Sequence, residues 1–126
     1  MNANDMKNRE LKFRAWENGR MVVSHNNFLN DSNFQNKWFF STIKIDSIIM
    51  QFTGLQDKNG KDIYEGDIVK FLDSDILFED IFTNNGIVEY SEWGFNITNR
   101  NEVDMCDLNN LECEIIGNIY ENPKLL

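Results

Sequence analysis

The residues best suited to bind a metal ion lie in one short segment, residues 57–65 of the 126-residue chain. Carboxylate and amide oxygens are the ligands that Ca²⁺ prefers. The spacing departs from a calcium-binding EF-hand loop, because Gly60 falls at the fourth loop position instead of the sixth and Ile68 at the twelfth. We therefore predict a tight turn with solvated acids and no metal site. The oxygen-bearing side chains of the segment are Asp57, Asn59, Asp62 and Glu65.

No other set of residues predicts catalysis. His25 is the only histidine, and Ser24 beside it is not evidence of a nucleophile and its base, because such pairs form in space and need a third orienting group. The glycines at 54, 60 and 66 are spaced as turns, not as a phosphate-binding loop before a helix. We predict no catalytic residue and no cofactor, and expect that the protein is not an enzyme.

The two cysteines and the N-terminal residues bear on the compartment. Cys106 and Cys113 cannot form a disulfide framework, and their spacing is not that of a zinc knuckle, so we interpret them as reduced and structural. Residues 1–6 show no secretory signal, and no apolar run approaches the roughly 18 residues that cross a membrane. We expect a cytoplasmic protein with no membrane partner.

The net charge limits the choice of partner. Subtracting 21 acidic from 12 basic residues gives −9, a charge that repels phosphate backbones. A nucleic-acid-binding protein would need a local basic patch, and Lys12, Arg14 and Arg20 near the first predicted hairpin are the candidate contacts. An acidic surface could instead occupy a basic nucleic-acid-binding site on another protein as a mimic.

Aromatic residues suggest an interface. Most of them fall on predicted strands, where large side chains usually fill a core. Trp93 and Tyr120 are the exposed-looking exceptions. We therefore take Trp93 and Tyr120 as candidates for a partner or subunit interface.

Short strands separated by turns account for most of the chain. Residues 11–16 alternate as a half-buried strand, and Asn18-Gly19 predicts a tight turn into a partner strand at 20–23. A central strand at 48–53 should end at Gly54, and Asn59-Gly60 should form a second hairpin. Residues 86–90 and 94–98 predict a third hairpin, and residues 113–120 a final strand.

Other segments are less regular. Residues 24–37 favour a loop or short helix, residues 73–85 an irregular strand or one or two helical turns, and residues 101–111 a short helix. In residues 68–71 the alternation places Ile68 and Lys70 on one face of a strand. It places Val69 and Phe71 on the other face. The segments 65–70 and 86–90 resemble the opening strands of SH3-like barrels. We predict a mainly β fold, a small SH3-like or irregular β-barrel or sandwich with short helical segments.

Three segments together resemble the YopX family of bacteriophage and prophage proteins. They are Phe13-Arg14-Ala15-Trp16, residues 51–69 (QFTGLQDKNGKDIYEGDIV) and residues 115–123 (IIGNIYENP). The resemblance implies a phage or prophage gene, a mostly β fold, a site of action in the host cytoplasm and self-association, and it supplies no catalytic residues. Residues 1–10 are then a flexible N-terminal segment and residues 11–126 a single YopX-like β domain, in which 18–45 and 73–85 lack a family pattern.

These observations favour a non-catalytic accessory protein of a phage or prophage that binds itself, as a homo-oligomer, or a host protein. An SH3-like nucleic-acid-binding protein is one alternative. An acidic counter-defence protein that mimics nucleic acid is the other.

Overall fold

The computed structural model describes residues 11–23, 39–40, 43–44, 46–75, 77, 80–92, 94–99, 102–107 and 112–126. Strands account for most of these residues, so the mainly β prediction is confirmed. No helix in the described ranges is long and apolar enough to span a membrane. The elements are β1 (Phe13–Glu17), β2 (Arg20–Val23), β3 (Ile48–Gln56), β4 (Asp62–Tyr64), β5 (Asp67–Asp75), β6 (Asp80–Ser91), β7 (Gly94–Asn99), β8 (Glu102–Asp107), β9 (Cys113–Asn118) and the 3-10 helix η2 (Pro123–Leu125).

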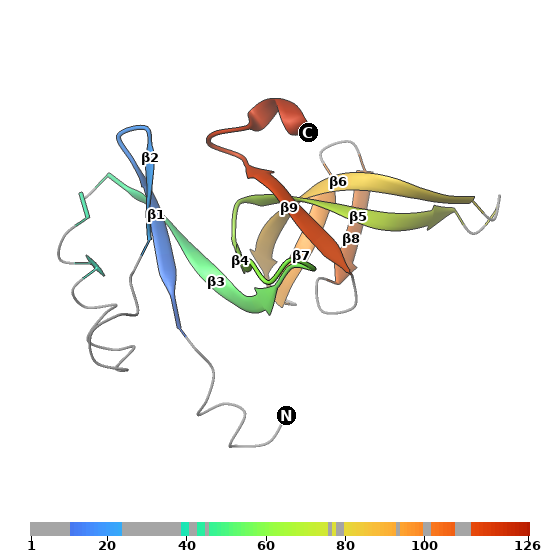
Figure 1. The fold of residues 1–126 in the computed structure, drawn as a ribbon, viewed down its shortest axis with the longest axis horizontal. Coiled ribbons are helices and arrows are strands. Elements are labelled where there is room, and N and C mark those ends of the chain that lie inside the picture. The colour runs from blue at the N-terminus through green and yellow to red at the C-terminus, as the bar shows by residue number, and fades with distance from the viewer. Residues whose placement is uncertain are drawn as a thin grey trace, which may run out of the picture. The chain divides into compact units, whose positions relative to one another are not determined.

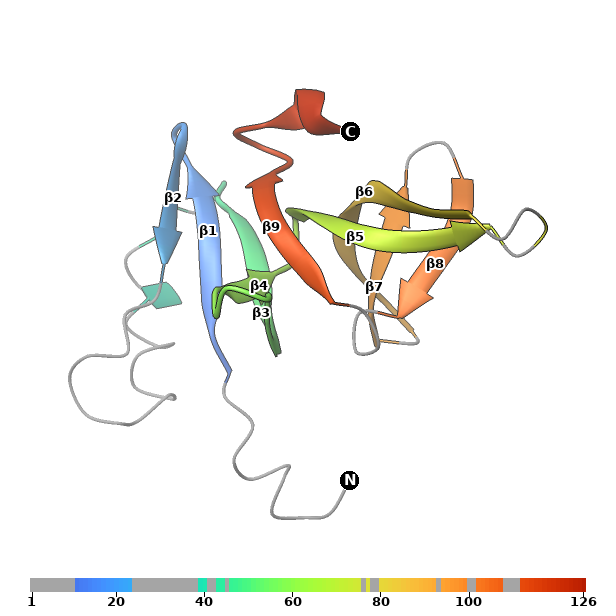
Figure 2. The same cartoon turned by 45° about the vertical axis from the view of Figure 1, so that its right-hand side comes forward.

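The chain forms two compact units, residues 1–54 and 55–126. In the first, β1 lies between β2 and β3 and pairs antiparallel with both (Figure 1). The second contains a five-stranded antiparallel sheet in the order β8-β7-β6-β5-β9 (Figures 1 and 2). The expectation of one domain over residues 11–126 stays a prediction.

The first hairpin forms as predicted. Asn18 and Gly19 both have positive φ, 48° and 78°, which is the conformation of the two-residue turn that matches strand twist. Arg14 and Ala15 point to opposite faces of β1, yet Arg14 is only 8% exposed and Ala15 is fully buried, so both faces are covered at this point of the strand. The expectation of a half-buried strand with Arg14 on a solvent face is therefore wrong.

The strand β3 continues past Gly54, where we expected it to end, and runs on to Gln56. Gly54 has a φ of +85°, a conformation that other residues adopt at a cost, so the glycine bends the strand without terminating it. The hairpin that follows reaches β4, its neighbour in the sheet. The predicted second hairpin is thus confirmed.

A small apolar core organises the second unit. It is built around residues from β4 to β9, of which Val69 and Val88 are completely buried. The pairing of β5 with β9 shifts register between Ile68 and Val69, and the extra residue, Ile116, lies on β9. The register of β5 with β6 is regular, so Ile68 and Val69 keep the predicted alternation, and both are completely buried. The core residues are Ile63, Val69, Phe71, Val88, Ile97 and Cys113.

Two further segments are strands. Residues 67–75 and 80–91 pair as an antiparallel hairpin, which confirms the strand alternative for most of 73–85. Residues 102–107 form β8 against β7, so the short helix predicted for 101–111 is wrong. The alternating polar and apolar residues of Glu-Val-Asp-Met-Cys-Asp suit an edge strand, a signal that we did not use. The segment 24–37 lies outside the described residues.

Gly86 allows β7 to pack against β6. A Cβ atom at this position would lie 2.4 Å from Cγ2 of Ile97 and 3.0 Å from the carbonyl oxygen of Thr98. Ile97 is 1% exposed and has no room to move away.

We predict that Gly86→Ala lowers the free energy of unfolding by roughly 1–3 kcal/mol, because an extra methyl group must displace a packed side chain. Urea denaturation followed by tryptophan fluorescence measures the change. Thr83→Ala, at an exposed position in the same strand, is the matched control and should change stability by less than about 0.5 kcal/mol. Equal stability of Gly86→Ala and wild type would contradict this close packing.

Candidate functional site

Asp57, the first residue of the segment with metal-like spacing, is a structural anchor. One carboxylate oxygen, Oδ1, accepts the N–H groups of Asn59 and Lys61 at 2.9 Å, and Oδ2 accepts the N–H of Ile115 at 3.0 Å. The residue is 6% exposed, so our expectation of solvated acids is wrong for Asp57. No group of three metal-ligating side chains occurs in the described part of the chain.

These hydrogen bonds set the charge state of Asp57. Burial by itself would raise the pKa of this carboxyl group, but the N–H groups of Ile115, Lys61 and Asn59, aided by the Lys61 ammonium, together lower the pKa below its ordinary value. Asp57 is therefore ionised at neutral pH, with its lone pairs directed at the backbone. The hairpin loop 57–61 is held to β9 by this side chain and by the bond from Lys58 N to the carbonyl of Cys113, 3.0 Å.

The C-terminal family segment is also structural. Oδ1 of Asn118 accepts the N–H groups of Tyr120 and Glu121 at 3.0 and 2.9 Å, and its Nδ2 donates to Glu121 at 3.0 Å. Tyr120, a candidate interface residue, is part of this turn and is partly buried. The second candidate, Trp93, lies outside the described residues.

The basic candidates do not form one exposed cluster. Arg14 is buried in β1, and the Lys12 ammonium lies 4.8 Å from the centroid of the Phe52 ring, a cation–π contact. Arg20 is exposed at the start of β2, opposite Glu17 and at the far end of the hairpin from Lys12. The alternative of nucleic-acid contacts through Lys12, Arg14 and Arg20 stays a prediction that this placement does not favour.

A different surface stands out, a projecting part of the β5–β6 hairpin. The β9 strand begins opposite Phe71, and β7 reaches only as far as Ile87. Within the described structure, residues 72–75 therefore pair only with 80–83, and residues 84–86 pair only with 69–71 of β5; this part of the hairpin extends past the neighbouring strands (Figure 1). We name residues 72–86 the β5–β6 arm.

Large apolar side chains of the β5–β6 arm face solvent. Leu72 is 60% exposed, Ile81 76% and Leu77 87%. Leu72 lies opposite Thr83, and Ile81 opposite Ser74, which places Leu72 and Ile81 on one face of the hairpin. This face is opposite to Phe71, which points into the core. Single exposed apolar residues are ordinary, but a contiguous set marks an interaction surface.

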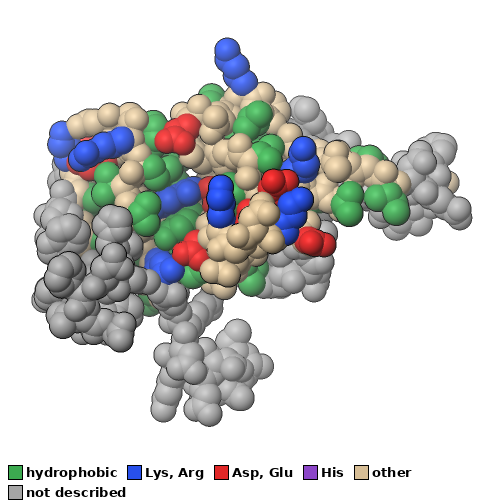
Figure 3. All heavy atoms as spheres, viewed as in Figure 1, with side chains coloured by type: hydrophobic (Ala, Val, Ile, Leu, Met, Phe, Trp, Pro, Cys, Tyr) green, Lys and Arg blue, Asp and Glu red, His purple; other side chains and the backbone are tan. Residues whose placement is uncertain are grey.

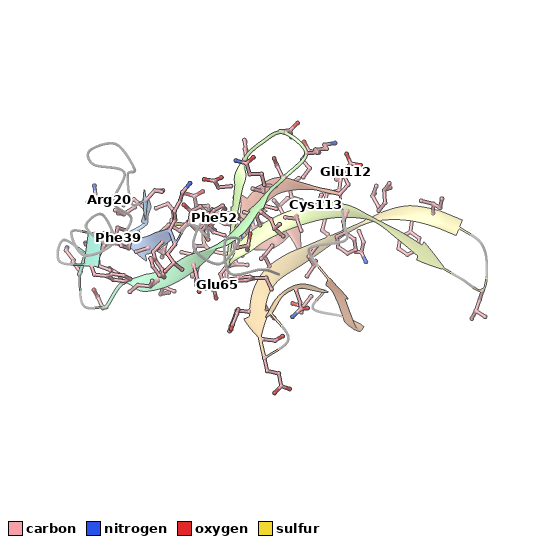
Figure 4. The ribbon with its side chains drawn as sticks, turned by 90° about the horizontal axis from the view of Figure 1, so that it is seen from below. Arg20, Phe39, Phe52, Glu65, Glu112 and Cys113 are labelled. Carbon is pink, nitrogen blue, oxygen red and sulfur yellow. The ribbon has the colours of Figure 1, made fainter. Side chains whose placement is uncertain are left out.

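A hollow of about 260 Å³ lies at the base of the same face. Two of the residues that line it form a salt bridge, with Lys58 Nζ 3.3 Å from a carboxylate oxygen of Glu114. Figure 3 shows hydrophobic side chains together with side chains of both charges on the face that it presents. Glu112 and Cys113, labelled in Figure 4, are the residue before β9 and its first residue. The lining residues are Lys58, Lys70, Phe71, Leu72, Thr83, Glu112, Cys113 and Glu114.

We call this hollow, together with Leu72 and Ile81, the outer arm face. Sequence analysis missed it as a site. The apolar residues among acids in 73–85 were a usable signal, because apolar side chains on a strand with no covering layer stay exposed. Only the register of β5 and β6 shows which of them share a face.

Cys113 is a buried free thiol in the core. Burial raises the pKa of this thiol, and the negative charges of Asp57 and Asp67 raise it further. The neutral thiol is a poor nucleophile, so Cys113 serves packing even though it is among the residues that line the hollow.

The fold defines a class, a mainly β protein built from two antiparallel sheets. Residues 8–126 match the family model of the YopX protein, so the chain belongs to the YopX family. It is similar to the crystal structure of protein EF1440 from Enterococcus faecalis, with 27% sequence identity over 92% of this chain and 97% of that chain and a TM-score of 0.54. No curated protein matches the chain.

We predict that Asp57→Asn destabilises the protein by roughly 1–3 kcal/mol at neutral pH, because an amide presents one acceptor oxygen where the carboxylate presents two. The folded pKa of Asp57 is lowered, so its contribution is present above the unfolded pKa of about 3.9 and is lost as pH falls through the folded value. The stability gap between wild type and variant should therefore shrink in acid. Urea denaturation across pH measures it.

The control for this substitution is Asp62→Asn, the same charge change in the same hairpin. Asp62 is less buried than Asp57, and it accepts a side-chain hydrogen bond from Gln56 at 3.1 Å. An equal loss of unfolding free energy in Asp62→Asn and Asp57→Asn would contradict the prediction. It would show that the charge of the loop, and not the hydrogen bonds of Asp57 to the backbone, explains the effect.

We predict that Cys113, studied in a Cys106→Ser background, is alkylated by iodoacetamide on the order of 100-fold more slowly in the folded protein than in urea, because reaction requires opening of the core. Mass spectrometry of quenched samples measures the rate. Rapid modification of the folded protein would contradict the raised pKa and burial.

Proposed function

We propose that this protein is a non-catalytic accessory protein of a phage or prophage that binds a host protein through the outer arm face. The observation that carries the proposal is the exposure of Leu72 and Ile81 on one face of a two-stranded projection. Burying these side chains against a partner would contribute roughly 1.5–3 kcal/mol each. The family resemblance supports the phage or prophage setting.

The charges near this face support a protein partner with basic residues. Residues 72–84 contain four acids and no lysine or arginine, a local charge of −4. A partner with an apolar strip flanked by lysine or arginine would complement both features. A phosphate backbone would be repelled by the same segment.

The charged residues that line the hollow would fix the orientation of a bound partner. Its rim carries Lys58, Lys70 and Glu114, so groups of either charge on a partner can be paired there. A polar rim around apolar anchors is the usual arrangement of a protein interface. The outer arm face therefore combines anchors with a means of fixing register.

We predict that Leu72→Ser reduces capture of a stoichiometric partner from nuclease-treated host lysate by about tenfold, the effect of losing roughly 1.4 kcal/mol of binding energy. Quantitative mass spectrometry of the tagged protein's eluate measures this. Val23→Ser, an exposed apolar position in the first unit, is the matched control and should capture as wild type does.

Two outcomes would overturn the proposal. One is capture that is lost with nuclease treatment, which would favour a nucleic-acid-binding role. The other is equal loss in Leu72→Ser and Val23→Ser, which would show that the outer arm face is not the specific surface.

A further inference from the structure

The outer edge of β6 is a second feature of the β5–β6 arm, distinct from its face. Before Ile87, β6 pairs only with β5 among the described strands. Edge strands are usually protected by charge or proline, yet residues 81–85 (Ile-Phe-Thr-Asn-Asn) have neither. The outer edge of β5 beyond β9 does carry acids, Asp73 and Asp75. Before Ile87, β6 carries one acid, Asp80 at its start, so its edge over residues 81–85 is the less protected of the two.

The backbone indicates which residues face this edge. Asn85 N donates to the side-chain oxygen of Asn84 at 2.9 Å, so this N–H is not directed at β5. Backbone groups alternate sides with a period of two along a strand. Ile81 and Thr83 therefore present their N–H and C=O groups outward, as Asn85 does, while Phe82 does not.

We propose that a second copy of this chain pairs with this edge, antiparallel and about a two-fold axis at Phe82. In that register Phe82 lies opposite the partner's Phe82, and Ile81 lies opposite the partner's Thr83. Outward-facing residues meet each other, as an antiparallel ladder requires. The two arms form a four-stranded sheet in the order β5-β6-β6-β5.

The acids are compatible with this pairing. Asp80 lies opposite the partner's Asn84, and the two Asp80 residues are four positions apart along the ladder, about 13 Å. In the order β5-β6-β6-β5, the two β5 strands are three strand spacings apart, so the acids of one lie about 14 Å from those of the partner's β5. Both separations exceed the Debye length of about 8 Å at physiological salt.

The pairing also adds two neighbouring strands to the two-stranded arm. A two-stranded hairpin alone is at best marginally stable in water, whereas additional strands stabilise it. Phe82, 44% exposed, gains an aromatic cross-strand partner, and β-branched Ile81 pairs with β-branched Thr83. This inference concerns the backbone edge of β6; it shares Ile81 and Thr83 with the outer arm face but does not rest on the proposed host partner.

Directed disulfide formation tests the register. Opposite residues in a non-hydrogen-bonded antiparallel pair have Cα atoms about 4.5 Å apart, within the range of a disulfide. In a Cys106→Ser background, Phe82→Cys should give a covalent dimer under mild oxidation. Leu72→Cys, more exposed but on β5, should not. Mixing Ile81→Cys with Thr83→Cys should cross-link the two variants to each other more than either to itself.

Sedimentation equilibrium tests the association without a cross-link. The wild type should dimerise, more tightly at higher salt because each chain carries −9. Thr83→Lys should weaken dimerisation at least about tenfold, since an edge charge blocks strand pairing. A monomeric wild type, or cross-linking of Phe82→Cys no faster than Leu72→Cys, would overturn the proposal. Leu72→Ser should leave dimerisation intact, which separates this result from the test of the host partner.

Discussion

The second unit depends on one ionised side chain, Asp57. Its two oxygens hold the backbone of its own hairpin loop and the N–H of Ile115, which lies in β9 far along the chain. β9 is an edge of the five-stranded sheet, and the loop covers part of it. Without a buried acceptor at this position, several backbone N–H groups would lose their partners at once. The resulting loss of stability is comparable to that from truncating a core side chain.

The same reasoning explains the family pattern. The loop at 57–61 and the turn after β9 use Asp57 and Asn118 to satisfy backbone groups. Ile119 N then bonds to the carbonyl of Gly66 at 3.0 Å, and Gly66 N to that of Val88 at 2.9 Å, which joins three separate segments. The residues that make the chain resemble its family are thus those that close the fold. The β5–β6 arm lies mostly in a segment without a family pattern.

Much of the fold could be predicted because its signals are local. Asn18-Gly19 dictates its own turn, and β-branched runs form strands wherever they are half covered. What could not be predicted depends on contacts distant in sequence. The register shift at Ile68 requires β9, and the burial of Arg14 requires β3 and the rest of the first unit. The candidate site was missed for the same reason, since the register of β5 with β6 and the position of the core decide that Leu72 and Ile81 share an exposed face.

The projecting arm is best understood as a sheet with missing neighbours. Phe71 and Leu72 are adjacent apolar residues in one strand, yet Phe71 is buried and Leu72 is mostly exposed. The two side chains point to opposite faces of β5, and the core covers the face of Phe71, whereas Lys70 and Leu72 on the other face are exposed. Apolar residues kept on an uncovered part of a sheet add nothing to the stability of the isolated chain, and they increase the risk of non-specific association. Their presence here is explained if the sheet is completed by another protein surface, which is why we place binding at the arm and not at the well-bonded turns.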